Sequence, residues 1–325
     1  MTNPHLTTMW GKFFHPAMPL ASRVERWDTP DGDFLDIVRT EGTADGPTFL
    51  LLHGLEGTHR SHYAAGTLHE AQRRGWQANL LTFRGCNGTM NRAARSYHSG
   101  ETGDLDRVVQ RLLAERPAAP LILAGVSLGG NVLLKWLGEQ GERARDRVAG
   151  ATAVSVPFDL ARSCAHMELG FTRLYGYNFL KSLKRKALLK IEQHPGIADS
   201  AQVLAARTLW EFDDAFTSVV HGFQDAADYY YRSSSIRYLD RIRVPTLLLS
   251  ARDDPFHPPA VLDDVQQLVR GNPALHTEFT DRGGHVGFVE GVHPWRVSYY
   301  AERRMLDFGA STLGAGTCPM KQFSS

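Results

Sequence analysis

Ser127 lies in a glycine motif whose surroundings would expose its hydroxyl for nucleophilic attack. It is the centre of the segment Gly125 to Gly129 (G-V-S-L-G), which ends an apolar run and opens a segment of helical composition. G-x-S-x-G between a strand and a helix forms a sharp turn that presents the serine at the carboxyl end of a sheet. The same pentapeptide also occurs as a plain turn, but the flanking segments favour a nucleophile.

A serine hydroxyl is a poor nucleophile without a base, so a histidine is required. Where such a serine heads a helix at the end of a parallel sheet, an acid and then a histidine follow it along the chain. His285 follows two glycines and comes after the last expected strand, Leu275–Thr280. We predict His285 as the base, with His257 and His293 as the alternatives.

The acid is expected in the loop after the apolar run Thr246–Ser250. Asp253 and Asp254 both lie there, and one of them could cap the following helix instead. The spacing from Asp254 to Pro258 is similar to the D-x-x-x-P arrangement common after this strand in α/β-hydrolases. We therefore favour Asp254 and keep Asp253 as the alternative.

Acyl transfer also needs hydrogen-bond donors for the oxyanion of a tetrahedral intermediate. The backbone N–H of Leu128, directly after the serine, is one candidate. The other is the N–H of Leu55, in an H-G-L-E-G loop that begins at His53 after an apolar run. Gly54 would let the backbone turn there, although the loop could also be a turn without catalytic duty.

Short apolar runs alternate with segments of helical period around these residues, which is typical of a parallel sheet covered by helices. We therefore predict an α/β-hydrolase fold, with a mostly parallel central sheet flanked by helices. An antiparallel edge hairpin is expected at Phe34–Arg39. The expected strands are Thr48–Leu52, Ala78–Phe83, Leu121–Val126, Ala149–Val156, Thr246–Ser250 and Leu275–Thr280, and the expected helices include Tyr63–Arg74 and Leu128–Gln140.

The alternation stops over residues 158–235, which contain no strand-like run. We predict a helical cap insertion there, a hydrolase core at 1–157 and 236–310, and a C-terminal tail at 311–325. Within the insertion, five basic residues alternate with apolar ones between Leu180 and Ile191, either as the solvated face of a helix or as a surface for anionic membranes. Aromatic residues such as Trp210 and Tyr229 could line an acyl pocket or pack the insertion on the core.

Bulk composition excludes several classes of protein. The 36 Lys and Arg against 35 Asp and Glu give a net charge of +1, which does not favour a nucleic-acid partner. Three scattered cysteines suit a reducing compartment rather than a disulfide framework or a zinc cluster. Neither a signal peptide nor an apolar stretch of membrane-spanning length is apparent. We expect a cytoplasmic protein without a transmembrane span, leave a peripheral membrane contact open, and infer no oligomeric state.

Seven motifs together resemble the YheT-like branch of the α/β-hydrolases. The resemblance spans roughly residues 3–308, and its motifs are N-P-H-L from Asn3, H-G-L-E-G from His53, F-R-G-C from Phe83, Y-H-S-G-E-T from Tyr97, G-V-S-L-G-G-N from Gly125, A-R-D-D-P-F from Ala251 and G-H-V-G-F from Gly284. It implies a Ser–Asp–His triad acting on acyl esters, with no metal and no organic cofactor.

From these residues we expect a serine esterase that hydrolyses short- to medium-chain acyl esters through an acyl-enzyme on Ser127. An acyltransferase that uses an alcohol as acceptor, and a catalytically silent binding protein, are the alternatives. A metal-dependent hydrolase is disfavoured because no H-x-H or H-E-x-x-H spacing occurs.

Overall fold

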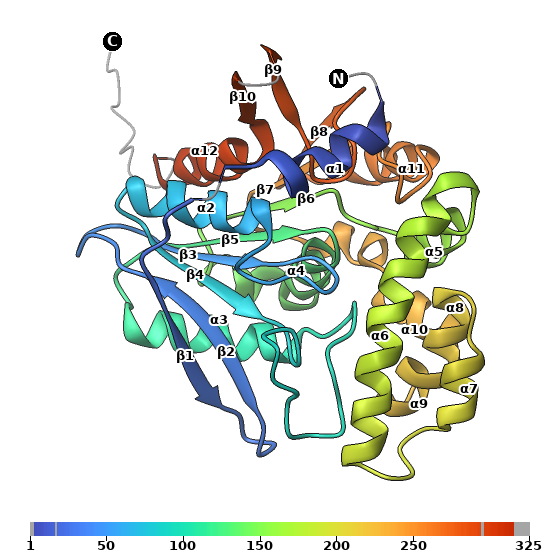
Figure 1. Cartoon of the computed structure of the whole chain (residues 1–325). Helices are drawn as coiled ribbons and strands as arrows, with labels where there is room; N and C mark the ends of the chain where they lie inside the picture. The colour runs from blue at the N-terminus through green and yellow to red at the C-terminus, as the bar shows by residue number, and fades with distance from the viewer. Residues whose placement is uncertain (1–2, 17, 294–295, 315–325) are drawn as a thin grey trace, which may run out of the picture.

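An eight-stranded sheet forms the centre of the molecule (Figure 1). The computed structural model describes residues 3–16, 18–293 and 296–314. The strands run in the order β1-β2-β4-β3-β5-β6-β7-β8. Their bounds are β1 Ser22–Asp28, β2 Phe34–Thr40, β3 Thr48–Leu52, β4 Gln77–Thr82, β5 Leu121–Val126, β6 Gly150–Val154, β7 Thr246–Ala251 and β8 Leu275–Thr280.

Strands β3 to β8 pair in parallel, whereas β1 and β2 form an antiparallel hairpin at one edge. The predicted α/β-hydrolase fold is confirmed. The antiparallel edge hairpin expected at 34–39 is present: this segment forms its inner strand β2 against β4, and β1 is the outermost strand. Strand β1 escaped the sequence pattern because it is mostly exposed and lacks an apolar run.

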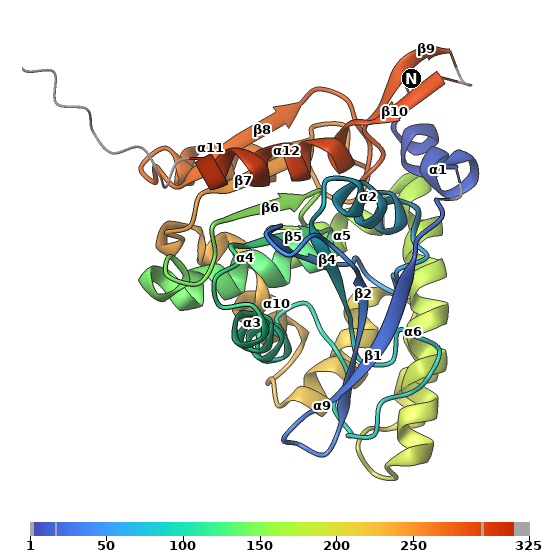
Figure 2. The same ribbon diagram turned by 90° about the vertical axis from the view of Figure 1, so that its left-hand side faces the viewer.

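Helices cover both faces of the sheet. Figure 2 shows α2 and α12 on one side and α3 and α4 on the other. Their bounds are α2 His62–Arg73, α3 Gly103–Glu115, α4 Leu128–Gln140, α11 Ala260–Val269 and α12 Tyr300–Gly314. Between β8 and α12, strands β9 (Val289–His293) and β10 (Arg296–Tyr299) make a small antiparallel pair.

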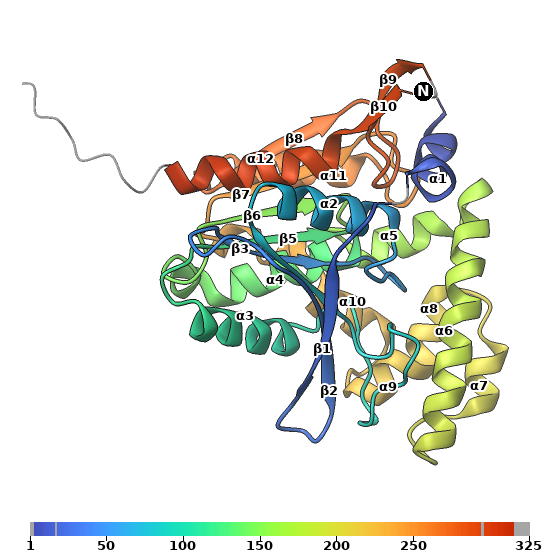
Figure 3. The same cartoon turned by 60° about the vertical axis from the view of Figure 1, so that its left-hand side comes forward.

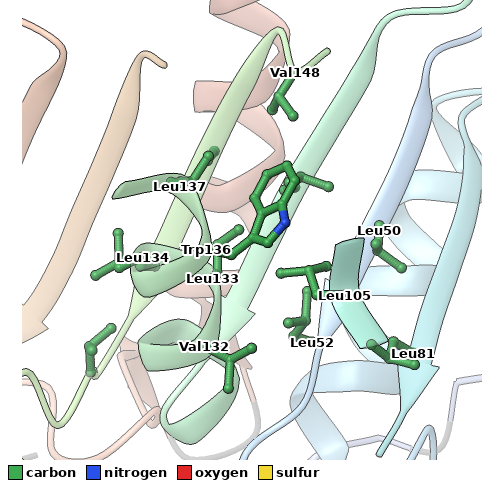
Figure 4. Close-up of a cluster of buried hydrophobic side chains, with 14 of the residues drawn as sticks. Leu50, Leu52, Leu81, Leu105, Val132, Leu133, Leu134, Trp136, Leu137 and Val148 are labelled. Atoms are coloured by element: carbon green, nitrogen blue, oxygen red, sulfur yellow. The ribbon is translucent and has the colours of Figure 1, made fainter. Parts of the chain in front are cut away.

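The core on the α3/α4 side is built on the indole of Trp136, which is fully buried among leucines and valines from both helices and the sheet (Figure 4). Helix α4 is buried over nearly its whole length, from Leu128 to Gly138. Because interiors are close-packed, this burial holds the first turn of α4 in one position relative to the sheet. The first turn of α4 directly follows Ser127.

Residues between β6 and β7 form helices at the carboxyl ends of the strands. The longest, α6, stands beside those ends, with α1 (Pro4–Phe14) next to its upper end (Figure 3). The main chain at the two ends of the segment is joined, because Ile236 N–H donates to Phe158 O at 3.1 Å. The helices are α5 Leu160–Met167, α6 Arg173–Gln193, α7 Ser200–Ala205, α8 Leu209–Phe212, the π-helical turn η3 Asp213–Thr217, α9 Ser218–His221 and α10 Ala226–Ser233.

The structure differs from the sequence expectation at two further places. Residues 311–314, expected in a tail, continue helix α12, where Leu313 packs against the core; residues 315–325 of that tail lie outside the described residues. Helix α1 was not expected at all, although Asn3 caps it by accepting from the N–H groups of His5 and Leu6. No helix in the described ranges combines the length and apolar character needed to cross a membrane.

Candidate active site

Ser127 stands at a strained turn between β5 and α4. Its backbone lies at φ 54° and ψ −121°, outside the regions that side-chain-bearing residues usually adopt. The two flanking glycines are required, because a Cβ on Gly125 would lie 2.5 Å from Gly129 O and one on Gly129 would lie 2.5 Å from Leu52 O. The turn places Ser127 in the lining of a pocket of about 990 Å³.

His285 and Asp254 form a continuous hydrogen-bonded chain with Ser127. His285 Nε2 lies 3.0 Å from Ser127 Oγ, and His285 Nδ1 lies 2.8 Å from Asp254 Oδ2. If Nδ1 carries the proton and donates to the carboxylate, Nε2 is free to accept the proton of the serine hydroxyl. The structure thus brings together the three side chains that were expected as a triad.

Asp254 is fully enclosed and has two histidines beside its carboxylate. Burial alone would raise its pKa, but His285 and His257 hold the pKa of Asp254 well below its usual range. His257 Nε2 lies 3.2 Å from Asp254 Oδ2, whereas the imidazole nitrogen beside Ser127 Oγ is that of His285. His257 therefore lies beside the acid and not beside the nucleophile, and the side chain of His293 lies outside the described residues.

Asp253, the alternative acid, has a different set of contacts. Its Oδ1 accepts from the N–H groups of Gly283 and Gly284 at 2.8 and 2.9 Å. These are the two residues before His285, so the side chain of Asp253 holds the loop rather than the imidazole. Asp254 thus contacts the ring of His285, whereas Asp253 contacts the backbone just before it.

Three contacts that the sequence did not indicate also position His285. Its N–H donates to Thr8 Oγ1 of α1 at 2.8 Å, and the next N–H, of Val286, donates to Ser155 Oγ at 3.0 Å. The ring of Phe256 stacks on the imidazole with centroids 4.0 Å apart. Thr8 and Ser155 are far from His285 in sequence, so no local pattern could have identified them.

The two expected oxyanion donors belong to two segments that adjoin Ser127, the loop after β3 and the first turn of α4. Within the described chain, neither the N–H of Leu55 nor that of Leu128 donates to a protein acceptor. The loop of Leu55 comes close to the serine, because a Cβ on Gly54 would lie 3.2 Å from Ser127 Cβ. Both N–H groups are thus available to a ligand, and that of Leu128 begins helix α4, where the helix dipole favours negative charge.

Glu56, the residue after Leu55, ties this loop to helix α6. Its carboxylate accepts from Lys186 Nζ and Tyr97 Oη, both at 2.7 Å, and from the hydroxyl of Ser182. Burial alone would raise the pKa of Glu56, but Lys186 beside it brings the pKa below its ordinary value. The sequence singled out Glu56 only as a letter of the H-G-L-E-G loop.

The basic run of α6 is therefore only partly a surface feature. Besides Lys186, Lys190 turns inward and donates to the carbonyl oxygens of Asn91 and Ala93 at 2.5 and 2.6 Å. Lys181 and Arg185 are exposed. Two of the five basic charges thus hold the helix on the protein and are unavailable to an external anionic surface.

His53 and Arg84 are occupied by structural contacts. His53 Nδ1 bonds its neighbour's carbonyl, Gly54 O, and its Nε2 accepts from Phe83 N–H, while burial lowers the pKa of His53 to about 4. The guanidinium of Arg84 bonds the carboxylates of Asp33 and Asp104. Within the described ranges, no three His, Cys, Asp or Glu side chains gather in a way that could hold a metal ion.

One pocket of about 990 Å³ contains the serine and histidine and extends to the inserted helices. Six aromatic residues of the insertion line it: Phe171, Tyr175, Phe179, Phe212, Tyr229 and Tyr230. Tyr231 is exposed, and Phe216 packs inside the insertion. Asp213, which carried no signal in the sequence, also lines this part of the pocket. Volumes of roughly 300 to 1,000 Å³ accommodate small organic ligands.

Comparisons with known proteins agree with this geometry. Residues 47–292 match the family described as alpha/beta hydrolase fold. The chain is 39% identical over 324 residues to "Putative esterase YheT" of Escherichia coli (strain K12), covering 98% of this chain and 93% of that protein. It is 30% identical to Phospholipase ABHD3 of Homo sapiens, over 93% of this chain and 75% of that protein.

Solved structures show the same fold at lower identity. The Pyrococcus furiosus esterase Pf2001 superimposes with a TM-score of 0.58 at 17% identity, covering 90% of this chain and 91% of that one. Fold, family match and sequence identity point the same way. The chain belongs to the α/β-hydrolase family, in its YheT-like branch.

Proposed function

We propose that the protein is a serine esterase that hydrolyses short- to medium-chain carboxylic esters through an acyl-enzyme on Ser127. The coarser activity, that of an esterase-type hydrolase, is supported by the family match and by the identity to YheT. The contact chain from Ser127 Oγ through His285 to Asp254 is the observation that carries the finer proposal. Three groups in this order are what activates a serine hydroxyl at neutral pH.

The proposed reaction begins when His285 Nε2 takes the proton of Ser127 as Oγ attacks the ester carbonyl. The carbonyl electrons move to its oxygen, which the N–H groups of Leu55 and Leu128 stabilise. The intermediate then collapses, the bond to the alcohol breaks, and His285 gives the alcohol its proton. Water attacks the acyl-enzyme by the same route, releasing the carboxylic acid and restoring Ser127.

Each side chain of the triad has a supporting feature in this scheme. The negative charge of Asp254, maintained by its depressed pKa, stabilises the imidazolium that forms when His285 takes the proton. Ser127 requires no rearrangement to meet the base, because the turn at φ 54° already directs it there. The pocket of about 990 Å³ leaves room for an acyl chain beside the serine.

Active-site labelling with a fluorophosphonate tests the proposal. We expect the folded protein to be labelled and the Ser127→Ala protein to be unlabelled, with hydrolysis of p-nitrophenyl butyrate reduced about 10⁴-fold or more. Esters of increasing acyl length then define the chain preference, and product analysis should find the acyl group as free acid. A well-folded protein that neither reacts with the probe nor hydrolyses any of these esters would contradict the proposal.

A further inference from the structure

Asp213 is a carboxylate in the pocket without a cationic partner. It lines the same pocket as Ser127 and His285, from the side of the inserted helices. Its Oδ1 accepts from Thr217 Oγ1 at 2.6 Å and its Oδ2 from Tyr230 Oη at 2.5 Å. Both partners are neutral hydroxyl groups. In the described chain, no Lys, Arg or His nitrogen comes within 4.0 Å of the Asp213 carboxylate.

The contrast with Glu56 makes this arrangement informative. Glu56 is the other carboxylate that lines the pocket, and it is paired with Lys186 at 2.7 Å. An enclosed charge normally acquires such a partner, because leaving it unpaired is costly. Burial raises the pKa of Asp213 to about 6, so the group is mostly ionised at neutral pH despite that cost.

Aromatic residues and one free hydroxyl line the same pocket as the carboxylate. Tyr229 and Tyr230, with ring centroids 5.0 Å apart, line this part of the pocket together with Phe212. Ring faces attract cations, most strongly where water is excluded. Ser163 also lines the pocket; its side chain is 5% exposed, and its Oγ has no hydrogen-bond partner in the described part of the protein.

The backbone at this place is also unusual. Asp213 begins the π-helical turn η3, an arrangement that is rare and occurs often at functional sites. The turn places Asp213 and Thr217 so that their side chains bond to each other. The π-turn and this hydrogen bond together orient the Asp213 carboxylate.

We propose that Asp213, with the rings of Tyr229, Tyr230 and Phe212, forms a subsite for a cationic amine or ammonium group of the ester substrate. A carboxylate among aromatic rings is the combination that recognises ammonium ions. The subsite rests on the proposed esterase function, since it lies in the pocket of Ser127. It adds a substrate class: esters that carry a positive charge at a distance from the carbonyl.

Pairs of esters that differ only in charge provide the test. One series carries a trimethylammonium group at the end of the alcohol chain, with two to six methylenes between nitrogen and ester oxygen. The other carries a tert-butyl group of the same shape. We expect the cationic ester to have the higher kcat/KM at the best spacer length, mainly through a lower KM, by about tenfold.

Two variants assign that preference to the carboxylate. Asp213→Asn keeps the size of the side chain and should bring the ratio of kcat/KM for the cationic ester to that for its neutral partner to about one. Glu192→Gln removes one negative charge from an exposed position of the same insertion and should change nothing. Equal kcat/KM for both series at every spacer length, or a preference that survives in Asp213→Asn, would overturn the subsite.

The pH dependence gives a readout that a structural role would not move. Tyr229, Tyr230 and Cys164 interact electrostatically with Asp213, and His98 packs on Tyr229 in the same pocket. Burial raises the pKa of Cys164 to about 12, raises the pKa values of both tyrosines well above their ordinary value, and lowers the pKa of His98 well below its ordinary value. Asp213 alone among them titrates near pH 6. The ratio of the two kcat/KM values, in which the triad cancels, should therefore fall towards one as the pH drops below about 6.

Binding without turnover separates this inference from the proposed function. Calorimetry with Ser127→Ala protein and the best cationic ester measures the subsite alone. Binding that weakens about tenfold in Ser127→Ala/Asp213→Asn supports the subsite even if hydrolysis proves absent. Hydrolysis of neutral esters together with no charge-dependent binding would refute the subsite and leave the esterase intact.

Discussion

The two walls of the pocket are built by different means. On the sheet side, Ser127 and Asp254 sit at the ends of parallel strands, and backbone bonds between neighbouring strands set their positions. On the helical side, the insertion meets the core through individual side chains, such as Lys186 on Glu56 and Lys190 on two carbonyl oxygens. The sheet side therefore holds the reacting residues in fixed positions. The helical side can be altered by substituting one contact residue at a time.

The two sides of the pocket also differ in the electrostatic surroundings of their carboxylates, Asp254 and Asp213. Asp254 lies beside two histidines and has a depressed pKa, whereas Asp213 has only hydroxyl partners and a raised one. Asp254 is buried and Asp213 is half-buried, and burial acts to raise the pKa of both carboxylates, so it does not explain why their shifts have opposite signs. The sign of the shift follows from the charges that the fold places next to each group.

The largest effect should come from substituting Asp254, the acid on the sheet side of the pocket. Asp254→Asn removes the charge that orients and stabilises His285, and we expect kcat for p-nitrophenyl butyrate to fall about 10⁴-fold with little change in KM. Asp253→Ala, which releases the N–H groups of Gly283 and Gly284, should cost about 10- to 100-fold. A greater loss in the Asp253 variant would reverse the assignment of the two acids.

A smaller effect should follow from removing the ion pair between Lys186 and Glu56, which joins the two sides of the pocket. Lys186→Met leaves the carboxylate of Glu56 enclosed and unpaired, and we expect about 3 kcal/mol less stability in urea unfolding. Displacement of the Leu55 N–H should also lower kcat about tenfold. Lys181→Met, at an exposed position on the same helix, is the matched control.

A double variant then separates charge from packing at that tie. Adding Glu56→Gln to Lys186→Met removes the unpaired charge, so part of the lost stability should return. Stability losses that simply add would mean that the two groups do not interact, and the tie between α6 and the Leu55 loop would have to be abandoned.

The smallest expected effect is the contribution of Asp213 to the pH dependence of the protein's free energy of unfolding. Its pKa rises from an ordinary 3.8 to about 6 on folding. Between these values the folded state binds more protons than the unfolded state, so this group's contribution to stability is present below pH 4 and is lost as the pH rises through 6. The Asp213→Asn substitution should therefore change the free energy of unfolding more favourably at pH 8 than at pH 4, by up to about 2 kcal/mol.

Thermal or urea unfolding at the two pH values measures this difference. A gain of equal size at both would mean that the charge of Asp213 is already compensated by protein groups. In that case the contrast between the two carboxylates would be one of location only.

Sequence reasoning succeeded where the signal is local. Strands β3 and β5 and helix α4 have the predicted bounds, because buried parallel strands are continuous apolar runs and Gly125 and Gly129 mark the turn. Strand β6 is shorter than the predicted 149–156, since Ser155 at φ 50° leaves the extended conformation. The three expected triad side chains meet in the structure, but that they perform catalysis stays a prediction.

What the sequence could not supply are contacts between distant segments. Thr8 supports the backbone of His285 across the whole chain, and Asp213 acquires its significance only from the pocket that it faces. Neither position has a motif. The arrangement of α5 to α10 depends on long-range side-chain packing, which composition and periodicity do not encode.

The main-chain bond between Phe158 and Ile236 has a consequence for descent. Because the two ends of the segment between β6 and β7 are bonded to each other, they meet the sheet at the same two points whatever the length of the segment. Doubling the length of a loop costs only about 0.6 kcal/mol more in closure entropy. Helices could be gained, lost or replaced between those points while the strands keep their register. In such a lineage, what a protein acts on can diversify while the means of acting is inherited unchanged.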